Sequence, residues 1–203
     1  MLRQGSADIL AVENVRSERW WPSPYEPETT AFGGPEGMEI AHALFHADSV
    51  GVLDHLHSGA EGNGQLDAKA TSLIITSILL RAAGQEWSEQ GDVWARVEAK
   101  RLLPEDIAAE RVSAMTGAMY RLLAIDTAPA LTPGSPLAHL APWAGAIRQG
   151  GQALGRAGRE GRLGLGTRSI LARYVLFHWN RMEFTLRQQA IWARAARETI
   201  LGS

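Results

Sequence analysis

The 203-residue sequence contains no cysteine, which excludes disulfide bonds, thiolate metal ligands and thiol nucleophiles. It also has no long apolar run. The longest, residues 73–80, is interrupted by Thr76 and Ser77 and is far too short to cross a bilayer. Residues 1–6 lack the apolar core of a secretory signal. These absences predict a cytoplasmic protein without a membrane-spanning segment.

The sequence also lacks a large excess of either charge, since its formal net charge is only −2 at pH 7. Nonspecific nucleic-acid binding needs a basic surface that neutralises phosphates, so this balance argues against DNA as a partner. The charge is unevenly placed: residues 1–67 carry an acidic excess, whereas residues 148–198 hold ten arginines and three glutamates. That basic part either attracts an acidic or RNA-like partner or forms an ordinary solvated face.

The length and the 45% hydrophobic content predict one domain with a proper core, of the α+β class and predominantly α-helical. Residues 8–21 resemble one or two short extended segments, and prolines 22, 24 and 27 keep the chain extended to Glu28. We therefore expect a small N-terminal β element followed by a bundle-like set of helices. Apolar spacing predicts these helices over residues 36–59, 68–83, 88–103, 104–124, 143–162 and 167–200.

Several of these helices have recognisable ends. Asp67, Ser88 and Thr167 are predicted N-caps. Residues 126–142 contain four prolines and are predicted to form a surface loop. Glycines recur every third residue from 155 to 164, which either lets two helices approach closely or marks a poorly formed helix. The second interpretation is favoured for residues 158–166, since an interior glycine costs about 1 kcal/mol relative to alanine.

The first candidate site lies at the end of the first predicted helix, where His46, Asp48 and Ser49 follow one another closely. His42 and His46 have the spacing of two metal ligands, but no third ligand accompanies them, so no metal site is predicted. Asp48 and Ser49 form either a catalytic pair or an N-cap that restarts the helix at Val50. A serine hydrolase is weakly supported because no Gly-x-Ser-x-Gly motif is present.

The second candidate site is the polar cluster at residues 178–181, inside the last predicted helix. Arg181 can bind a carboxylate through two hydrogen bonds, Asn180 can donate an amide N–H, and His178 can transfer a proton near neutral pH. In the alternative interpretation Arg181 faces solvent and His178 is a hydrogen-bonded, half-buried imidazole. Arg168 follows a glycine loop that lacks the lysine of a phosphate-binding Walker motif, which leaves a substrate carboxylate as its ligand.

The sequence resembles a known family at Tyr25-Glu26-Pro27-Glu28-Thr29, Gly33-Gly34-Pro35, residues 44–49 (Leu-Phe-His-Ala-Asp-Ser) and Asn180-Arg181. These segments are similar to the thiopeptide-type bacteriocin biosynthesis family, which includes the C-terminal glutamate-elimination domain of class I lantibiotic dehydratases. The resemblance extends from about residue 20 to the C-terminus. It implies one domain over residues 1–203 that lacks the family's usual N-terminal β-rich part.

The resemblance implies a lyase that acts on a ribosomally made precursor peptide without a cofactor. Serine or threonine esterified with glutamate would lose glutamate and become a dehydroamino acid. The expected partners are the precursor peptide and a tRNA-dependent glutamylating dehydratase subunit, and a homodimer remains open. One alternative is a formal [4+2] cycloaddition of two dehydroalanines that builds the pyridine of a thiopeptide. A second alternative is a non-catalytic subunit that docks a dehydratase or its peptide.

Under the elimination hypothesis the proton is transferred by His178, and the leaving group is oriented by Ser49 and His46. The carboxylate would be bound by Arg181 with Asn180, and the glutamyl ammonium by Glu26 or Glu28. Two departures from the family pattern accompany these assignments. Ala31-Phe32 replaces an arginine and an aromatic residue before Gly33-Gly34, and Leu176-Phe177 replaces a His-Met pair.

Overall fold

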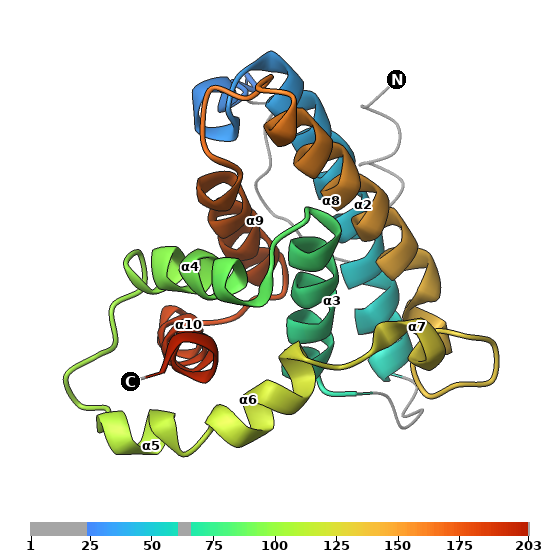
Figure 1. Ribbon diagram of the computed structural model, residues 1–203. Helices are drawn as coiled ribbons and strands as arrows, with labels where there is room; N and C mark the ends of the chain where they lie inside the picture. The colour runs from blue at the N-terminus through green and yellow to red at the C-terminus, as the bar shows by residue number, and fades with distance from the viewer. Residues whose placement is uncertain (1–23, 61–65, 203) are drawn as a thin grey trace.

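The computed structural model describes residues 24–60 and 66–202, and all regular structure within these ranges is helical (Figure 1). The predominantly helical prediction is therefore confirmed. The β element predicted within residues 8–21 lies outside the described residues, and the described ranges contain no strand. None of the helices in these ranges has both the length and the apolar character needed to span a bilayer.

Two short 3₁₀ turns and nine α-helices make up this part of the chain (Figure 1). In order they are η1 (Thr29–Phe32), α2 (Pro35–Ala60), α3 (Ala68–Ala82), α4 (Trp87–Glu98), α5 (Ala109–Ser113), α6 (Thr116–Leu123), α7 (Thr127–Ala130), η2 (Ala138–Leu140), α8 (Ala141–Arg159), α9 (Thr167–Arg181) and α10 (Leu186–Leu201).

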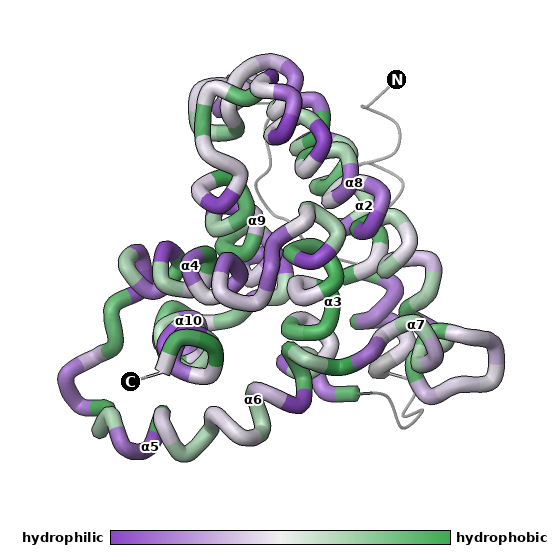
Figure 2. Tube along the Cα trace, in the orientation of Figure 1, coloured by the Kyte–Doolittle hydropathy of each residue, from purple (hydrophilic) through white to green (hydrophobic). Residues whose placement is uncertain are grey.

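Helix α3 is the centre of the fold, since every residue from 71 to 80 is buried. Figure 2 shows strongly hydrophobic residues along this helix. Its predicted N-cap is confirmed: Asp67 Oδ1 accepts a hydrogen bond from the Ala70 N–H at 2.7 Å. Helix α8 packs closely on it, because a Cβ added at Gly151 would lie only 2.8 Å from the Leu79 carbonyl oxygen. Close helix approach is therefore one function of the α8 glycines, and α8 ends at Arg159, before the predicted end at residue 162.

The last predicted helix is in fact two helices. Helix α9 ends at Arg181, Glu183 adopts a positive φ of 56°, and α10 begins at Leu186. Thr185 caps α10 by accepting from the Gln188 N–H. The prediction of one helix over 167–200 was therefore wrong, because an apolar periodicity that continues across a turn does not reveal the turn. The polar cluster at 178–181 consequently lies in the last turn of α9, not in mid-helix.

Further boundaries also differ from the sequence predictions. Helix α2 runs unbroken, so Asp48 and Ser49 do not restart a helix at Val50. Helix α4 begins at Trp87 with Glu86 as its N-cap and ends at Glu98, which corrects both the Ser88 cap and the end at residue 103. The helix predicted over 104–124 is split into α5 and α6, and the predicted loop 126–142 contains α7 and η2.

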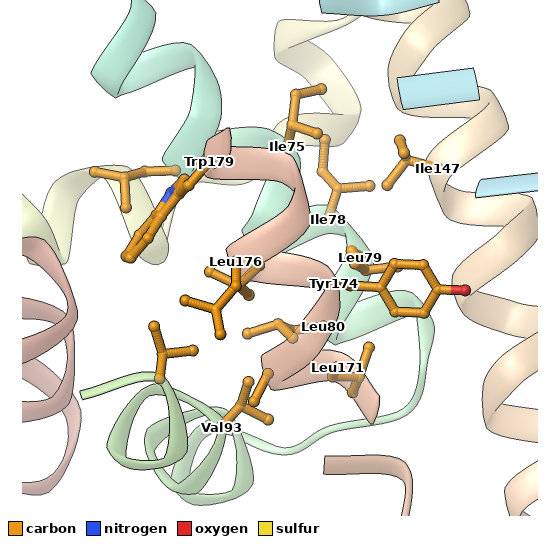
Figure 3. Packing of buried hydrophobic residues seen from close by; sticks show 14 of the residues in the cluster. Ile75, Ile78, Leu79, Leu80, Val93, Ile147, Leu171, Tyr174, Leu176 and Trp179 are labelled. Carbon is orange, nitrogen blue, oxygen red and sulfur yellow. The ribbon is translucent and has the colours of Figure 1, made fainter. Parts of the chain in front are cut away.

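Helix α9 has two buried faces, which together place the candidate site. Figure 3 shows Leu176 and Trp179 on one side of this helix and Tyr174 on the other, toward Ile147 of α8. Trp179 stacks on Trp94 of α4 with ring centroids 5.7 Å apart. The opposite face meets α2 and α3, and it is there that the polar residues of α9 are buried.

Candidate functional site

One imidazole joins three helices. His178 lies in the last turn of α9 and is buried. Its Nδ1 is 2.9 Å from Oδ1 of Asp48 on α2, and its Nε2 is 2.9 Å from Oγ of Ser72 on α3. All three side chains are buried, so these hydrogen bonds form in a medium of low dielectric. The His178–Asp48–Ser72 network, as we call it, is the main polar link between these helices.

The direction of the hydrogen bonds follows from the chemistry of the groups when the carboxylate is ionised and the imidazole is neutral. An ionised carboxylate only accepts, so the His178 Nδ1–H donates to Asp48. A neutral imidazole then carries its lone pair on Nε2, which accepts from the Ser72 hydroxyl. The order of groups is that of a Ser-His-Asp triad. Ser72 is completely buried, however, so its hydroxyl orients the imidazole and is not accessible as a nucleophile.

Arg181 extends the network toward solvent. One of its Nη atoms donates to Asp48 Oδ2 at 3.3 Å, and its guanidinium lies 4.4 Å from the centroid of the Phe45 ring. The Arg181 side chain is 22% exposed, whereas that of Asp48 is 7% exposed. Asp48 therefore bridges the imidazole and the guanidinium, and the buried carboxylate has both a charge partner and hydrogen-bond donors.

A cavity of about 20 Å³ lies beside the network, lined among others by Asp48, His178, Arg181 and Tyr174. This volume is enough for one water molecule and too small for a peptide side chain. The Tyr174 hydroxyl is buried and has no hydrogen-bond partner among the described residues. Burial raises the pKa of this phenol far above its usual range, against a smaller opposing effect of the Arg181 charge. Tyr174 therefore remains a neutral donor.

A larger cleft of about 260 Å³ opens on the outer side of Arg181. Its polar lining comes from Glu26, Glu28 and Arg181, and its apolar lining from Tyr25, Phe32, Met38, Phe45 and Phe177. Phe45 and Arg181 line both this cleft and the small cavity, so the two spaces adjoin. We call this space the aromatic cleft.

Two contacts fix the mouth of the aromatic cleft. The Tyr25 hydroxyl is 2.6 Å from His42 Nε2, and Glu28 forms an ion pair with Arg173 at 3.3 Å. The extended segment before η1 is thereby attached to α2 and to α9. This arrangement explains why a proline-rich segment contributes side chains to a cleft built on helices.

The structure brings four of the predicted site residues together. Glu26, Glu28 and Arg181 line the aromatic cleft, and His178 lies one turn before Arg181 in the small cavity wall. The other four lie elsewhere, and the sequence patterns did not distinguish the two groups.

His46 is exposed on α2, about 200° around the helix from Asp48. Ser49 is half-buried and lines none of the described cavities. Asn180 is exposed and accepts from Gln189 Nε2 at 3.1 Å. Arg168 begins α9, about 20 Å along the helix from Arg181, and pairs with Asp92 at 3.3 Å.

Sequence reasoning missed Ser72, and it considered Asp48 as the partner of Ser49 or as an N-cap, not as the partner of His178. A signal for Ser72 was present, because four hydroxyl residues, at positions 71, 72, 76 and 77, occur within an otherwise apolar helix. Most buried hydroxyls have hydrogen-bond partners, so such a helix indicates polar groups on the elements packed against it. Ser77 follows the same rule by donating to the Leu123 carbonyl at 2.7 Å.

The described residues hold no group of three or more histidine, aspartate or glutamate side chains arranged to bind a metal ion. The His42 and His46 pair, spaced like metal ligands, is accordingly without a third ligand in this part of the chain, and His42 is bound to Tyr25.

Comparison with known proteins agrees with the resemblance seen in the sequence. The family model described as the C-terminal part of lantibiotic biosynthesis dehydratases matches residues 4–200. No curated protein and no solved structure matches the chain. The family is associated with dehydration of ribosomally made peptides, in which a precursor peptide and a dehydratase take part. Because the match covers nearly the whole sequence, the chain belongs to the lantibiotic dehydratase C-terminal family.

Proposed function

We propose that this chain is a lyase that eliminates glutamate from glutamylated serine or threonine in a precursor peptide. The observation that carries the proposal is the aromatic cleft, which is lined by Glu26, Glu28 and Arg181 and adjoins the small cavity lined by His178. The cleft offers groups of both charges to a substrate that itself carries an ammonium and carboxyl groups.

The reaction has a simple balance. A base removes the Cα proton, the Cα–H electrons form the Cα=Cβ double bond, and the Cβ–O bond breaks so that glutamate leaves as a carboxylate. The enzyme therefore needs a proton acceptor near Cα and cationic or N–H donors near the departing oxygen. Arg181 has five N–H donors, and the structure uses one of them for Asp48. Its remaining donors serve the leaving group.

The proton acceptor in this proposal is the pair formed by His178 and Asp48. His178 does not line the aromatic cleft, but the water-sized cavity that it lines adjoins the cleft at Phe45 and Arg181. A water molecule in that cavity would connect the substrate to the imidazole once Nε2 exchanges the Ser72 hydroxyl for that water, since general bases also act through one water. Asp48 would stabilise the imidazolium that forms, in the same way that it orients the neutral ring.

The two glutamates that line the aromatic cleft have different roles in the proposed reaction. Glu28 is already paired with Arg173 and holds the segment in place. Glu26 is exposed and lines the cleft, and it is the group that meets the glutamyl ammonium. Tyr25 adds an aromatic face beside that position, which also favours a cation.

The test is a reconstituted dehydration assay with a glutamylating partner, read by mass spectrometry. His178→Ala is expected to accumulate glutamylated peptide, with a rate loss of about 100-fold or more, as for removal of a general base. The matched control is His57→Ala, an exposed histidine of α2 outside the cleft. Dehydrated peptide formed at the wild-type rate by His178→Ala would contradict the proposal.

A non-catalytic docking subunit is the second candidate. It is favoured by one observation: both ring nitrogens of His178 are already hydrogen-bonded within the protein. In that case the double variant His178→Ala/Arg181→Ala, if folded, would still raise the activity of its dehydratase partner. The cycloaddition alternative is tested in the same assay by supplying a dehydrated azole peptide. Pyridine formation would then be detected as a new chromophore and as release of the leader peptide.

A further inference from the structure

A separate pocket of about 580 Å³ lies between α3, α7 and α8. Figure 1 shows α7 beside the beginning of α8. Two arginines, Arg81 of α3 and Arg148 of α8, line this pocket together with Asp126 and the hydroxyl residues Thr127 and Thr132. None of these residues belongs to the aromatic cleft or to the His178–Asp48–Ser72 network.

Arg81 is fixed in place but only partly satisfied. Its Nε donates to the Ser77 carbonyl at 3.3 Å, and one Nη donates to the Ile125 carbonyl at 2.8 Å. The other Nη is buried and has no hydrogen-bond partner among the described residues. A buried guanidinium N–H without a partner is unfavourable, so a bound acceptor at this side chain would be stabilising.

A second cation in the same pocket makes an anionic acceptor more favourable. Arg148 is half-buried and makes no ion pair with any described residue. Burial lowers the pKa of the Arg81 guanidinium, Asp126 opposes this effect, and the charge of Arg148 adds to it. The two guanidinium groups are thus close enough to repel each other, and an anion between them would relieve the repulsion.

The charge balance selects the class of anion. Two guanidinium groups and the Asp126 carboxylate leave one net positive charge. Asp126 lowers the net charge of the pocket without an ion pair to any described residue, and its Oδ1 accepts from the Ala128 N–H at 3.1 Å. A singly charged carboxylate balances the site, whereas a phosphate dianion would leave an excess negative charge. Leu131 supplies an apolar wall for an aliphatic stem.

We propose that the pocket between Arg81 and Arg148 binds a carboxylate on a short aliphatic stem. Such a group is carried by an acidic residue of a peptide or by a free acidic amino acid, and both offer the same chemistry to the two guanidinium groups. This site is additional to the aromatic cleft and does not depend on the elimination chemistry proposed there.

The test is a titration of the intact chain followed by amide NMR and calorimetry. The probes are free glutamate and a capped tripeptide with a central glutamate, each compared with its glutamine counterpart, and inorganic phosphate. Saturable binding is expected for a glutamate probe and not for its glutamine counterpart. Binding of the tripeptide alone identifies an acidic peptide as the ligand, and binding of the free amino acid alone identifies a small molecule.

The variant for this test is Arg148→Gln, because Arg81 also supports the turn at Ile125 and its loss would disturb folding. Loss of one charged hydrogen-bonding group should weaken glutamate binding about 10- to 100-fold. Arg156→Gln, an exposed arginine further along α8 and outside the pocket, should leave binding unchanged. The proposal is overturned if neither glutamate probe binds, if Arg148→Gln binds as the wild type does, or if phosphate binds more tightly than glutamate.

Discussion

Two polar clusters join different sets of helices in the fold, and they differ in what surrounds them. One is the His178–Asp48–Ser72 network between α2, α3 and α9. The other joins α4 to α10, where Glu98 and Glu198 pair with Arg194 and Arg197. Both bury charge. Only the first borders a cavity and a cleft, since no member of the α4–α10 cluster lines a described pocket.

The hydrogen bonds of the α4–α10 cluster are also more complete. Glu198 accepts from Ser113 at 2.7 Å and from Arg194, and Arg197 donates to the Gly202 carbonyl at 2.7 Å. Every carboxylate there meets a cation, which is the arrangement expected of a structural link. Beside His178, in contrast, the Tyr174 hydroxyl has no partner among the described residues, and Arg181 retains free donors. Burial of charge alone does not identify a site, whereas burial next to accessible space does.

The largest expected effect is on stability, in the α4–α10 cluster. Glu198→Gln removes the charge that Arg194 and Arg197 share and should lower the free energy of unfolding by about 3–5 kcal/mol, as for a broken buried ion pair. Urea denaturation measures this change. The control Glu160→Gln breaks an exposed pair with Arg162 and should cost less than about 1 kcal/mol. A similar cost for both variants would remove the contrast between buried and exposed pairs.

The second effect concerns the aromatic cleft. Arg181→Gln should lower kcat/KM for a glutamylated peptide about 10- to 100-fold, because one charge-assisted contact to the substrate is lost. The control is Arg187→Gln, an exposed arginine paired with Asp106 away from the cleft. Steady-state kinetics at a temperature where both variants are folded gives the comparison, and equal kinetics for the two would show that the cleft does not bind the reacting group.

The third effect is smaller and concerns the orientation of His178. Ser72→Ala removes the hydroxyl donor to Nε2 and should destabilise the fold by about 1 kcal/mol. Nitrogen NMR of the imidazole distinguishes orientation from mere packing. The wild type should show the Nδ1–H form, with its Nε2 signal shifted in Ser72→Ala while Asp48 still holds Nδ1. An Nε2–H form in the wild type would overturn the assigned hydrogen-bond directions.

The smallest effect is a pH dependence of stability. Burial raises the pKa of Glu198, but hydrogen bonds from Ser113 and Arg194 and the nearby arginine charges outweigh it and hold the pKa below its ordinary value of 4.5. A carboxyl group whose pKa is depressed on folding stabilises the fold above its unfolded pKa. That contribution is then lost as the pH falls below about 4.5 through the folded value. Stability measured from pH 6 to pH 3 should therefore fall less steeply in Glu198→Gln than in the wild type.

Much of the fold could be predicted from the sequence, and the reason is periodicity. The buried helix α3 and its Asp67 cap follow from apolar spacing and one side chain. The break between α9 and α10 did not, because it depends on a positive φ at Glu183, a residue type with no preference for that conformation. Local patterns report local structure, and a turn made by an unremarkable residue leaves no such pattern.

The candidate site shows the same limit in three dimensions. His178 and Arg181 were predicted because a cluster of polar residues inside an apolar helix is conspicuous. Ser72, the partner of His178, lies 106 residues before it, and nothing in the sequence places the two side chains together. Arg168 and His46 had equally suggestive neighbours, yet they lie apart from the aromatic cleft. Only tertiary packing separates these cases.

The contrast between the two clusters is tested most directly by Asp48→Asn and Glu198→Gln assayed side by side. Glutamylated precursor peptide is incubated with equal concentrations of folded protein, and its conversion to dehydrated peptide is followed by mass spectrometry. We expect Asp48→Asn to accumulate glutamylated peptide and Glu198→Gln to convert it at the wild-type rate. Equal conversion by both variants would contradict the assignment of the site to the His178–Asp48–Ser72 network.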